Sequence, residues 1–325
     1  MTQDSLTKPC LKDRFINICR TRHLSLSTER GYWSWVCRFV NYSSIKAEID
    51  LTTNAEQKFS DFISSIAPNV SSSTQNQAWN AIVFLYRDVL NHQLGDIPSA
   101  MRAKRLGRIR PVPCDHEQAL KIVDAAPGLP GLALRLIYGT AMRIKECLRL
   151  RLKDFDFENN LILIYDGKGG KDAFIPMPLK LREELLNLVR DREIDFLKDK
   201  LANKHWVFLP DSLGKKYPKW HFKSDWQYAF ASERFSRDPR TGNEGRHHLS
   251  PEAVQQAMAK ACSKLGIKRR FTPHGLRHAG ARFAEKNGTP ISEIQRWLRH
   301  KDVETTLRYL GIGEQRPARV TGPFG

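Results

Sequence analysis

The sequence predicts a mainly α-helical protein with one small β-sheet and two domains, and three observations support this prediction. Residues 1–95, and most of the chain beyond residue 114, carry apolar side chains at helical spacing. Two short alternating runs, LILIY and AFIPMP, flank the glycine-rich sequence DGKGGKD, which is the pattern of a β-hairpin. Residues 96–113 are rich in Lys and Arg and end in Pro-Val-Pro, which is typical of a linker. The 325 residues are enough for two domains.

The first domain, residues 1–95, is expected to be a bundle of four short helices. LKDRFINICRTR is amphipathic, and Ser27 or Thr28 is expected to cap the second helix. Two more helices follow, around AEQKFSDFISSIA and TQNQAWNAIVFLYRDVL, with a run of serines between them. The second helix has an apolar stripe made of Tyr32, Trp35, Val36, Phe39 and Val40. This stripe indicates a packed core rather than a platform for nucleotide bases.

The linker, residues 96–113, is predicted to contact a polyanion. Bundles rarely contain such a basic segment, so we place the boundary between the domains here. A basic linker between two basic domains suits a clamp around DNA. The residues expected to contact the DNA backbone are Lys104, Arg105, Arg108 and Arg110.

The second domain, residues 114–325, begins with two predicted helices, HEQALKIVDAA and the buried GLALRLIY. A Gly-Thr break follows, and the next helix is expected to carry Arg143 and Glu146. Lys168 then lies at the tip of the predicted hairpin, where a lysine is usually only solvated. It gains a role if the hairpin points at the same anion as Arg143. A long charged helix, LREELLNLVRDREIDFLKDKLANK, comes next.

Residues 206–250 have little helical or strand periodicity but are rich in aromatic side chains among Lys and Arg. Aromatic rings interleaved with cations suit stacking on unpaired bases together with contacts to a phosphate backbone. The alternative is an insertion with a small core of its own, to which some of these rings must belong. After this insertion, residues 251–266 predict an ordinary helix.

Four chemically active side chains are expected to converge between residues 271 and 309. His274 and Arg277 are three residues apart, so they share a helix face. Two further short helices, ISEIQRWL and VETTLRYL, bring His300 and Tyr309. Guanidinium groups match phosphate oxygens, histidines donate to oxygens or move protons, and a phenol can attack a phosphodiester. A single His-x-x-Arg is common by chance, and a lone tyrosine on an apolar helix is usually in the core.

A zinc site is the alternative for His274 and His278, which have the spacing of a zinc protease. Gly275 stands where that motif has glutamate, so we expect no metal site. The six cysteines form no C-x-x-C pair, which suits a reducing compartment rather than a disulfide framework. We therefore expect no metal and no other cofactor.

The net charge of the chain is +18, which indicates a polyanionic partner. Lipid headgroups are the competing polyanion. No run is apolar enough to span a bilayer and the N-terminus lacks a signal-peptide pattern, so we expect a cytoplasmic protein without membrane association.

The order Arg143, Lys168, His274, Arg277, His300 and Tyr309 resembles the tyrosine recombinase (phage integrase) family. GTAMRIKECLRLRLKDFDF is similar to its first arginine motif, GKGGK to its hairpin lysine, and TPHGLRH and LRHKDVETTLRY to its last two motifs. The residues before 95 resemble the core-binding domain of the family, so the resemblance covers nearly the whole chain. This chain has Leu298-Arg299-His300 where the family usually has Leu-Gly-His, and Leu310-Gly311-Ile312 where it usually has Thr-His-Val.

The insertion resembles the additional segment of integron integrases, through KKYP, DWQYAF, SRDPRTG and RHHL. In that subfamily the segment holds bases flipped out of a folded single-stranded recombination site. The resemblance implies that four residues stack on extrahelical bases: Trp226, Pro239, His247 and His248. Rings and the flat face of proline are chemically suited to this.

The resemblance implies a site-specific DNA recombinase that forms a 3′-phosphotyrosine through Tyr309 and integrates or excises gene cassettes. It implies DNA, duplex and folded single-stranded, as the partner and a homotetramer on two DNA sites as the assembly. Three alternatives stay open. These are a catalytically weakened DNA-binding or architectural protein, a phage-type integrase without the integron specialisation, and a type IB topoisomerase.

Overall fold

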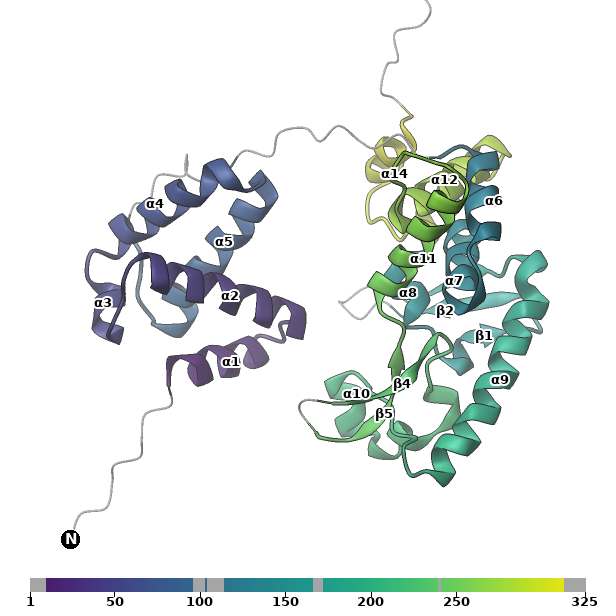
Figure 1. Cartoon of the computed structure of the whole chain (residues 1–325), viewed down its shortest axis with the longest axis horizontal. Coiled ribbons are helices and arrows are strands. Elements are labelled where there is room, and N and C mark those ends of the chain that lie inside the picture. Colours follow the sequence, from purple (N-terminus) through teal and green to yellow (C-terminus); the bar gives the residue numbers. More distant parts are fainter. Residues whose placement is uncertain (1–9, 96–102, 104–113, 166–171, 239–240, 313–325) are drawn as a thin grey trace, which may run out of the picture. The chain divides into compact units, whose positions relative to one another are not determined.

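The computed structural model describes residues 10–95, 103, 114–165, 172–238 and 241–312. The chain divides into two compact units, Met1–Arg110 and Pro111–Gly325, which are described one at a time (Figure 1). Both are mainly helical, and the second also contains two small antiparallel sheets. The predicted fold class, mainly helical with little sheet, is therefore confirmed. No helix in the described ranges is long and apolar enough to cross a bilayer.

The first unit consists, in its described part, of a helical bundle. Its helices are α1 (Leu11–Thr21), α2 (Leu26–Tyr42), α3 (Glu48–Thr52), α4 (Ala55–Ile66) and α5 (Ser72–Phe84), the last continued by a π-helical turn at Leu85–Val89. The short α3 has no counterpart in the prediction. Ser25, rather than Ser27 or Thr28, caps α2, and its hydroxyl accepts a hydrogen bond from the Thr28 amide at 3.2 Å. Ser71 caps α5 in the same way.

The aromatic stripe of α2 forms part of the bundle core. Trp35 and Phe39 are buried, and both rings make edge contacts with Phe62 of α4. The hydroxyl of the fully buried Tyr86 donates to the carbonyl of Leu51 at 2.8 Å, so its polar group is satisfied inside the core. The interpretation of this stripe as core is correct.

The second unit is built around a central buried helix. In its described part the helices are α6 (His116–Ala125), α7 (Gly128–Thr140), α8 (Ile144–Leu148), α9 (Arg182–Leu201), α10 (Asp211–Lys216), α11 (Pro251–Lys264), α12 (Pro273–Lys286), α13 (Ile291–Leu298) and α14 (Val303–Leu310). Helix α7 contacts α6, α8, α11 and α12, and most of its side chains are buried. Figure 1 shows these helices gathered at one end of the unit, with α9 along one side.

Helix α12 packs closely on α7 because Gly280 has no side chain. A Cβ at this position would lie 2.0 Å from the carbonyl oxygen of Tyr138 in α7. The two backbones therefore approach more closely than any larger residue would permit. This contact fixes α12, which carries His274 and Arg277, against the core of the unit.

The first sheet contains the predicted hairpin and one additional strand. Its strands are β1 (Phe155–Asp156), β2 (Leu161–Ile164) and β3 (Ala173–Pro176), paired antiparallel in this order, with Ile162 opposite Ile175. Both of these isoleucines are buried, whereas β1 is too short to show an alternating pattern. The predicted hairpin tip with Lys168 lies outside the described residues.

The insertion is more ordered than its sequence pattern indicates. Two strands, β4 (Ala231–Arg237) and β5 (Glu244–His248), form an antiparallel hairpin with a register shift between Ala231 and Phe235. The sequence of β4 shows little periodicity because the strand is exposed on both faces from Glu233 to Arg237, so no buried face requires an apolar residue at every second position. A Cβ on Gly245 would lie 1.7 Å from the carbonyl oxygen of Trp206, so β5 lies directly against that segment.

Arg151 joins the insertion to the rest of the unit. It is buried, with its guanidinium 3.7 Å from the centre of the Tyr228 ring. Its two terminal nitrogens donate to the carbonyls of Trp226 at 2.7 Å and Phe208 at 2.8 Å. A buried cation with these partners fixes the insertion on the segment that follows α8.

Candidate active site

Three short helices bring one tyrosine, three histidines and one arginine together. The ring centre of Tyr309 in α14 lies 6.0 Å from that of His274 and 4.4 Å from that of His278, both in α12. It lies 5.4 Å from the ring of His300, which follows α13. The Arg277 guanidinium lies 5.9 Å from the same ring centre. Four of these five residues are the ones for which the sequence predicts convergence; His278 is the addition.

Local sequence explains how α12 presents these groups. Thr272 caps the helix, with its hydroxyl accepting from the Gly275 amide at 3.1 Å, and Pro273 occupies the first turn. His274, Arg277 and His278 then follow at i, i+3 and i+4, which places them on one face.

The turn from α13 to α14 brings His300 and Tyr309 to that face. Helix α13 begins at Ile291 and is preceded by Pro290. Asp302 precedes α14 but makes no side-chain capping bond. His300 Nδ1 lies 3.0 Å from the hydroxyl of Thr306, which is buried one helical turn before Tyr309. This contact fixes the ring of His300 beside the tyrosine.

Arg277 is a buried cation with only part of its hydrogen-bonding capacity used. Its side chain is 2% exposed, and Nη2 donates to the carbonyl of Leu298 at 2.9 Å. Nε and Nη1 make no hydrogen bond to the described residues. Burial lowers the pKa of Arg277 to about 10, so the group remains charged at neutral pH. A charged fork with unused donors is suited to an anionic ligand.

Glu146 holds the cations of the site together. Its carboxylate accepts from the Arg143 amide at 2.6 Å and from Arg143 Nη1 at 2.8 Å. It lies 3.7 Å from Arg277 Nη1 and forms an ion pair with Arg299 Nη2. Burial alone would raise the pKa of Glu146, but the contacts with Arg299 and Arg143 outweigh it and lower the pKa. Glu146 is therefore a carboxylate at neutral pH.

Arg143 stands immediately before α8, not within it as the sequence suggested. It is the N-cap residue of that helix, in an extended conformation. Its side chain is 46% exposed, and its guanidinium pairs with Glu146. Arg143 thus extends from the buried carboxylate towards solvent, where a large substrate is accessible.

His274, His300 and Tyr309 are neutral near pH 7. Burial, with the charges of Arg277, Arg143 and Arg299, lowers the pKa of His300 to about 4. Partial burial and the charges of Arg277 and Arg143 also lower the pKa of His274. Burial raises the pKa of Tyr309, and the charges of Arg277 and Arg143 only partly offset this. The Tyr309 hydroxyl is buried and makes no hydrogen bond of good geometry within the described residues.

The site therefore combines a neutral phenol, the neutral imidazoles of His274 and His300, and the guanidinium groups of Arg143 and Arg277. Such a set can bind a tetrahedral anion, take a proton from the phenol and stabilise charge that develops on non-bridging oxygens. In the described part of the chain, no group of three or more His, Cys, Asp or Glu side chains is arranged to hold a metal ion.

The other predicted site residues lie elsewhere in the second unit or outside the described residues. Lys168, Pro239, Lys104, Arg105, Arg108 and Arg110 are not among the described residues. Trp226, His247 and His248 belong to the insertion, and no contact places them beside Tyr309.

Trp226 belongs to a row of stacked groups on the insertion. Its ring stacks on Trp220 at 4.7 Å, and Trp220 stacks on Tyr217 at 4.0 Å. Lys153 Nζ lies 4.3 Å from the Trp226 ring centre and 4.1 Å from that of Tyr165. The row joins the insertion to the end of β2, and Trp226 already has partners in it.

The two adjacent histidines of β5 have different surroundings. His248 makes an edge contact with Tyr228, and its Nδ1 lies 2.6 Å from the Leu249 carbonyl. Burial lowers the pKa of His248 to about 4. His247 is the more exposed of the two, and its ring lies 4.1 Å from that of His248.

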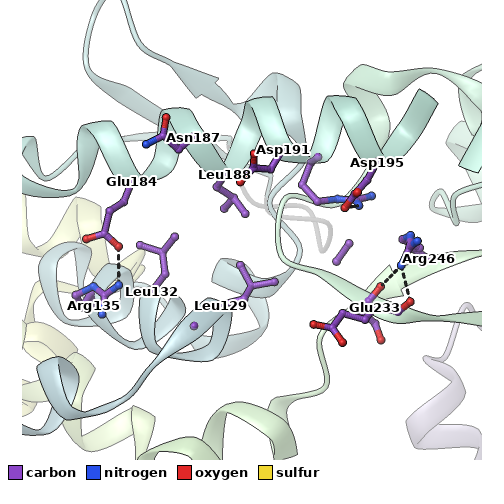
Figure 2. Close-up of a pocket in the computed structure, with 14 residues that line it drawn as sticks. Leu129, Leu132, Arg135, Glu184, Asn187, Leu188, Asp191, Asp195, Glu233 and Arg246 are labelled. Atoms are coloured by element: carbon purple, nitrogen blue, oxygen red, sulfur yellow. Dashed lines mark hydrogen bonds and ion pairs between the residues drawn. The ribbon is translucent and has the colours of Figure 1, made fainter. Parts of the chain in front are cut away.

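A pocket of about 540 Å³ lies apart from this site, where α7, α9 and the β4–β5 hairpin meet (Figure 2). Leu188 of α9 and Leu129 and Leu132 of α7 line it, and its charged groups are largely matched to one another. Arg135 Nη2 lies 2.5 Å from Glu184 Oε2, and Arg192 Nη1 lies 2.9 Å from Asp195 Oδ2. None of the predicted site residues lines it.

Sequence reasoning missed three residues of the site. His278 was considered only as a zinc ligand, although its i+4 spacing from His274 already placed it on the same face. Thr306 gave no signal beyond its position one turn before Tyr309. Arg299 was noted only as a departure from a Leu-Gly-His pattern, and its ion pair with Glu146 depends on tertiary structure.

Comparisons with known proteins show the family of the chain. The model of the phage integrase family matches residues 114–316, and that of the phage integrase N-terminal SAM-like domain matches residues 11–96. A protein described as integrase/recombinase from Escherichia coli is 34% identical over 305 residues, covering 94% of this chain and 90% of that protein. Tyrosine recombinase XerA of Pyrococcus furiosus is 27% identical over 222 residues, covering 67% of this chain and 64% of that protein.

Solved structures have the same fold. A lambda integrase dimer bound to a COC′ core site matches with a TM-score of 0.61 and 17% identity, covering 95% of this chain and 97% of that chain. XerH site-specific recombinase bound to difH substrate matches with a TM-score of 0.60 and 18% identity, covering 94% and 83%. By its family models and its relatives, this chain belongs to the phage integrase family of tyrosine recombinases and is a site-specific DNA recombinase.

Proposed function

We propose that this recombinase is of the integron integrase type and integrates or excises gene cassettes at folded single-stranded DNA sites. The observation that carries the proposal is the insertion, a folded segment with a row of aromatic rings and cations on a tyrosine recombinase. Unpaired bases present faces that such rings can cover, whereas a perfect duplex does not. In this proposal Trp226, Pro239, His247 and His248 contact the extrahelical bases.

In the proposed reaction, the Tyr309 oxygen attacks a DNA phosphorus atom and forms a 3′-phosphotyrosine while the bond to the 5′ oxygen breaks. Because the pKa of Tyr309 is raised, its proton must leave during the attack. His274, whose pKa is lowered, is neutral and can accept that proton. Lys168 gives a proton to the leaving 5′ oxygen. Attack by another 5′ hydroxyl on the phosphotyrosine then rejoins the DNA and restores the phenol.

Arg143 and Arg277 clamp the non-bridging oxygens in this mechanism, and His300 donates to the same oxygens. The supporting features are the unused donors of Arg277 and the solvent-directed guanidinium of Arg143. Removing one donor that faces developing charge typically lowers kcat by about 10²–10³. Glu146 orients both guanidinium groups.

The proposal extends to the organisation of the whole chain. Residues 1–95 and 114–325 form a DNA-binding and a catalytic domain, joined by the basic linker 96–113 with Lys104, Arg105, Arg108 and Arg110. Strand exchange joins two DNA sites and therefore uses four protomers. The chain would act where its DNA lies, in the cytoplasm.

The test is a suicide-substrate cleavage assay with a folded single-stranded hairpin and its duplex equivalent. Wild-type protein should form a denaturation-resistant adduct and should form it faster on the hairpin. Tyr309→Phe should abolish the adduct while DNA binding stays nearly unchanged, because only the nucleophilic oxygen is lost. An adduct in this variant would contradict the assignment of the nucleophile.

The second candidate is a phage-type integrase that uses duplex sites. The observation in its favour is that Trp220 and Lys153 already contact the Trp226 ring, so a base must displace one of them or stack at the end of the row. Equal cleavage of hairpin and duplex by wild-type protein would support this candidate over the integron type.

A further inference from the structure

Arg299 occupies a backbone position that favours glycine. It follows α13 with φ 51° and ψ 51°, in the left-handed region. Its amide lies 3.1 Å from the carbonyl of Arg296, and the His300 amide lies 3.2 Å from the carbonyl of Gln295. These are the two bonds of a Schellman turn, in which the left-handed residue is usually glycine. A side chain here costs conformational energy, so its retention calls for a compensating contact.

The compensating contact is Glu146. The Arg299 side chain is 7% exposed, and its Nη2 forms an ion pair with the Glu146 carboxylate. Within the described residues, its terminal nitrogens make no other hydrogen bond. A buried guanidinium without a partner would be strongly unfavourable, so the carboxylate determines where this side chain lies.

The turn that carries Arg299 is connected to the site at three successive residues. The Leu298 carbonyl accepts from Arg277, Arg299 pairs with Glu146, and His300 contacts Thr306. The end of α13 is therefore joined to α12, to α8 and to α14. Of these three successive residues, Arg299 is the one that contacts the Glu146 carboxylate.

The ion pairs of Glu146 indicate how its contact with Arg299 affects the site. Glu146 is the one carboxylate that ion-pairs with Arg143, Arg277 and Arg299 in the described residues. Arg299 Nη2 and Arg143 Nη1 share Glu146 Oε1, while the Arg143 amide and Arg277 Nη1 face Oε2, so the Arg299 ion pair helps to fix the orientation of the carboxylate. The carboxylate then stays close to the Arg143 amide and guanidinium, at 2.6 and 2.8 Å.

We propose that Arg299 is a positioning residue that acts through Glu146 to orient the guanidinium groups of Arg143 and Arg277 for the DNA phosphate. The proposal rests on the phosphate-clamp role given to those two arginines above. In this arrangement Arg299 does not itself contact the phosphate, and its removal slows cleavage without weakening DNA binding to the same extent.

The matched variant is Arg299→Gly, because glycine favours the left-handed turn and keeps His300 in place. Single-turnover cleavage of the suicide substrate at saturating DNA should fall about 10-fold, a typical size for coupled neighbours. DNA affinity should change by less than about 2-fold. Arg299→Lys should recover part of the rate, since lysine supplies the charge without the planar fork. Arg296→Ala, which removes an exposed ion pair on the same helix, is the control and should leave the rate unchanged.

A double-mutant cycle with Glu146→Gln separates positioning from direct contact. If Arg299 acts through Glu146, then Arg299→Gly should add little to the loss already caused by Glu146→Gln. The proposal would be overturned if the rate losses of the two single variants multiply in the double variant. It would also be overturned if Arg299→Gly leaves the rate unchanged, or lowers DNA affinity as much as it lowers the rate.

Melting temperatures of the wild type, Arg299→Gly, Glu146→Gln and the double variant give a second cycle. This cycle depends on the ion pair and not on cleavage. Non-additive shifts are expected, and additive shifts would count against the contact itself. Absence of any wild-type adduct would contradict the proposed function, whereas additive shifts would contradict only this inference.

Discussion

Single histidines of the second unit are expected to make the protein sensitive to acid. His300 and His248 each have a pKa of about 4, mainly because burial disfavours the charged imidazole. An unfolded histidine titrates near 6.5. Below that pH the unfolded chain binds protons that the folded chain does not, so the unfolded state gains relative stability.

The melting temperature of the second unit should therefore be highest above pH 6.5 and should fall as the pH drops towards 4. His300→Gln and His248→Gln should each make the fall shallower, and thermal melting across this pH range is the measurement. Asn243→Gln, an exposed replacement without a titrating group, is the control. A melting temperature that stays constant from pH 7 to pH 4.5 would mean that these imidazoles titrate normally in the folded protein.

At the same scale, Arg277 and Glu146 show how the positive charge of the site is partly compensated within the protein. Arg277 keeps its charge with one carbonyl partner and one distant carboxylate. Glu146 offsets part of the charge of three arginines. Removing Glu146 would leave buried positive charge without compensation, which is more costly than removing an exposed ion pair. The residual positive charge is what a phosphate would neutralise.

At the scale of elements, the insertion is the segment whose role is most open to test. Its small core consists of Val207, Tyr228 and Ala231, and the buried Arg151 fixes it to the rest of the unit. Trp226 is only partly buried, in the row with Trp220 and Lys153. Core and exposed rings therefore occur within a few residues of one another.

Trp226→Ala should weaken binding to a bulged hairpin by about 1–3 kcal/mol, the range for one base stacked on an aromatic ring. Binding to a perfect duplex should change little, since a duplex offers no flipped base. Affinity for both substrates should be measured together with the melting temperature. Phe222→Ala, which removes an exposed ring of the same insertion, is the matched control. Equal losses on both substrates would assign Trp226 to structure.

At the scale of the whole molecule, charge governs the interaction with DNA. The net charge of +18 predicts that many counterions leave the DNA on binding. Affinity should fall by about 10³ or more between 50 and 200 mM salt, if six or more phosphates are contacted. Replacing Lys104, Arg105, Arg108 and Arg110 by glutamine should make the slope of log affinity against log salt shallower.

Binding isotherms at several salt concentrations, on one duplex and one hairpin, measure this slope. The linker variant tests whether residues 96–113 take part, because its slope should decrease by about one unit for each phosphate that the linker no longer neutralises. A flat dependence in wild-type protein would contradict a clamp around DNA.

The sequence by itself determined the fold class and the order of the chemical groups. Helical periodicity predicts α1, α2, α4, α5 and the later helices, because burial of an apolar stripe is a local pattern. The spacing of His274, Arg277, His300 and Tyr309 along short capped helices predicts that they converge. Elements of two to five residues, such as β1 and α3, were missed because such short runs carry no period.

Only the tertiary structure decided which side chains those groups contact. Arg143 binds Glu146 from three residues away, but Arg299 lies 153 positions from Glu146, and nothing local indicates that it pairs with this carboxylate. Strand β4 carries no alternating pattern because most of it is exposed on both faces, and the stacking of Trp226 on Trp220 depends on two short helical turns folding together. A local sequence pattern determines a helix or strand because the interactions that stabilise it involve residues close in the chain. Ion pairs and stacked rings depend on distances between segments, which only the folded chain sets.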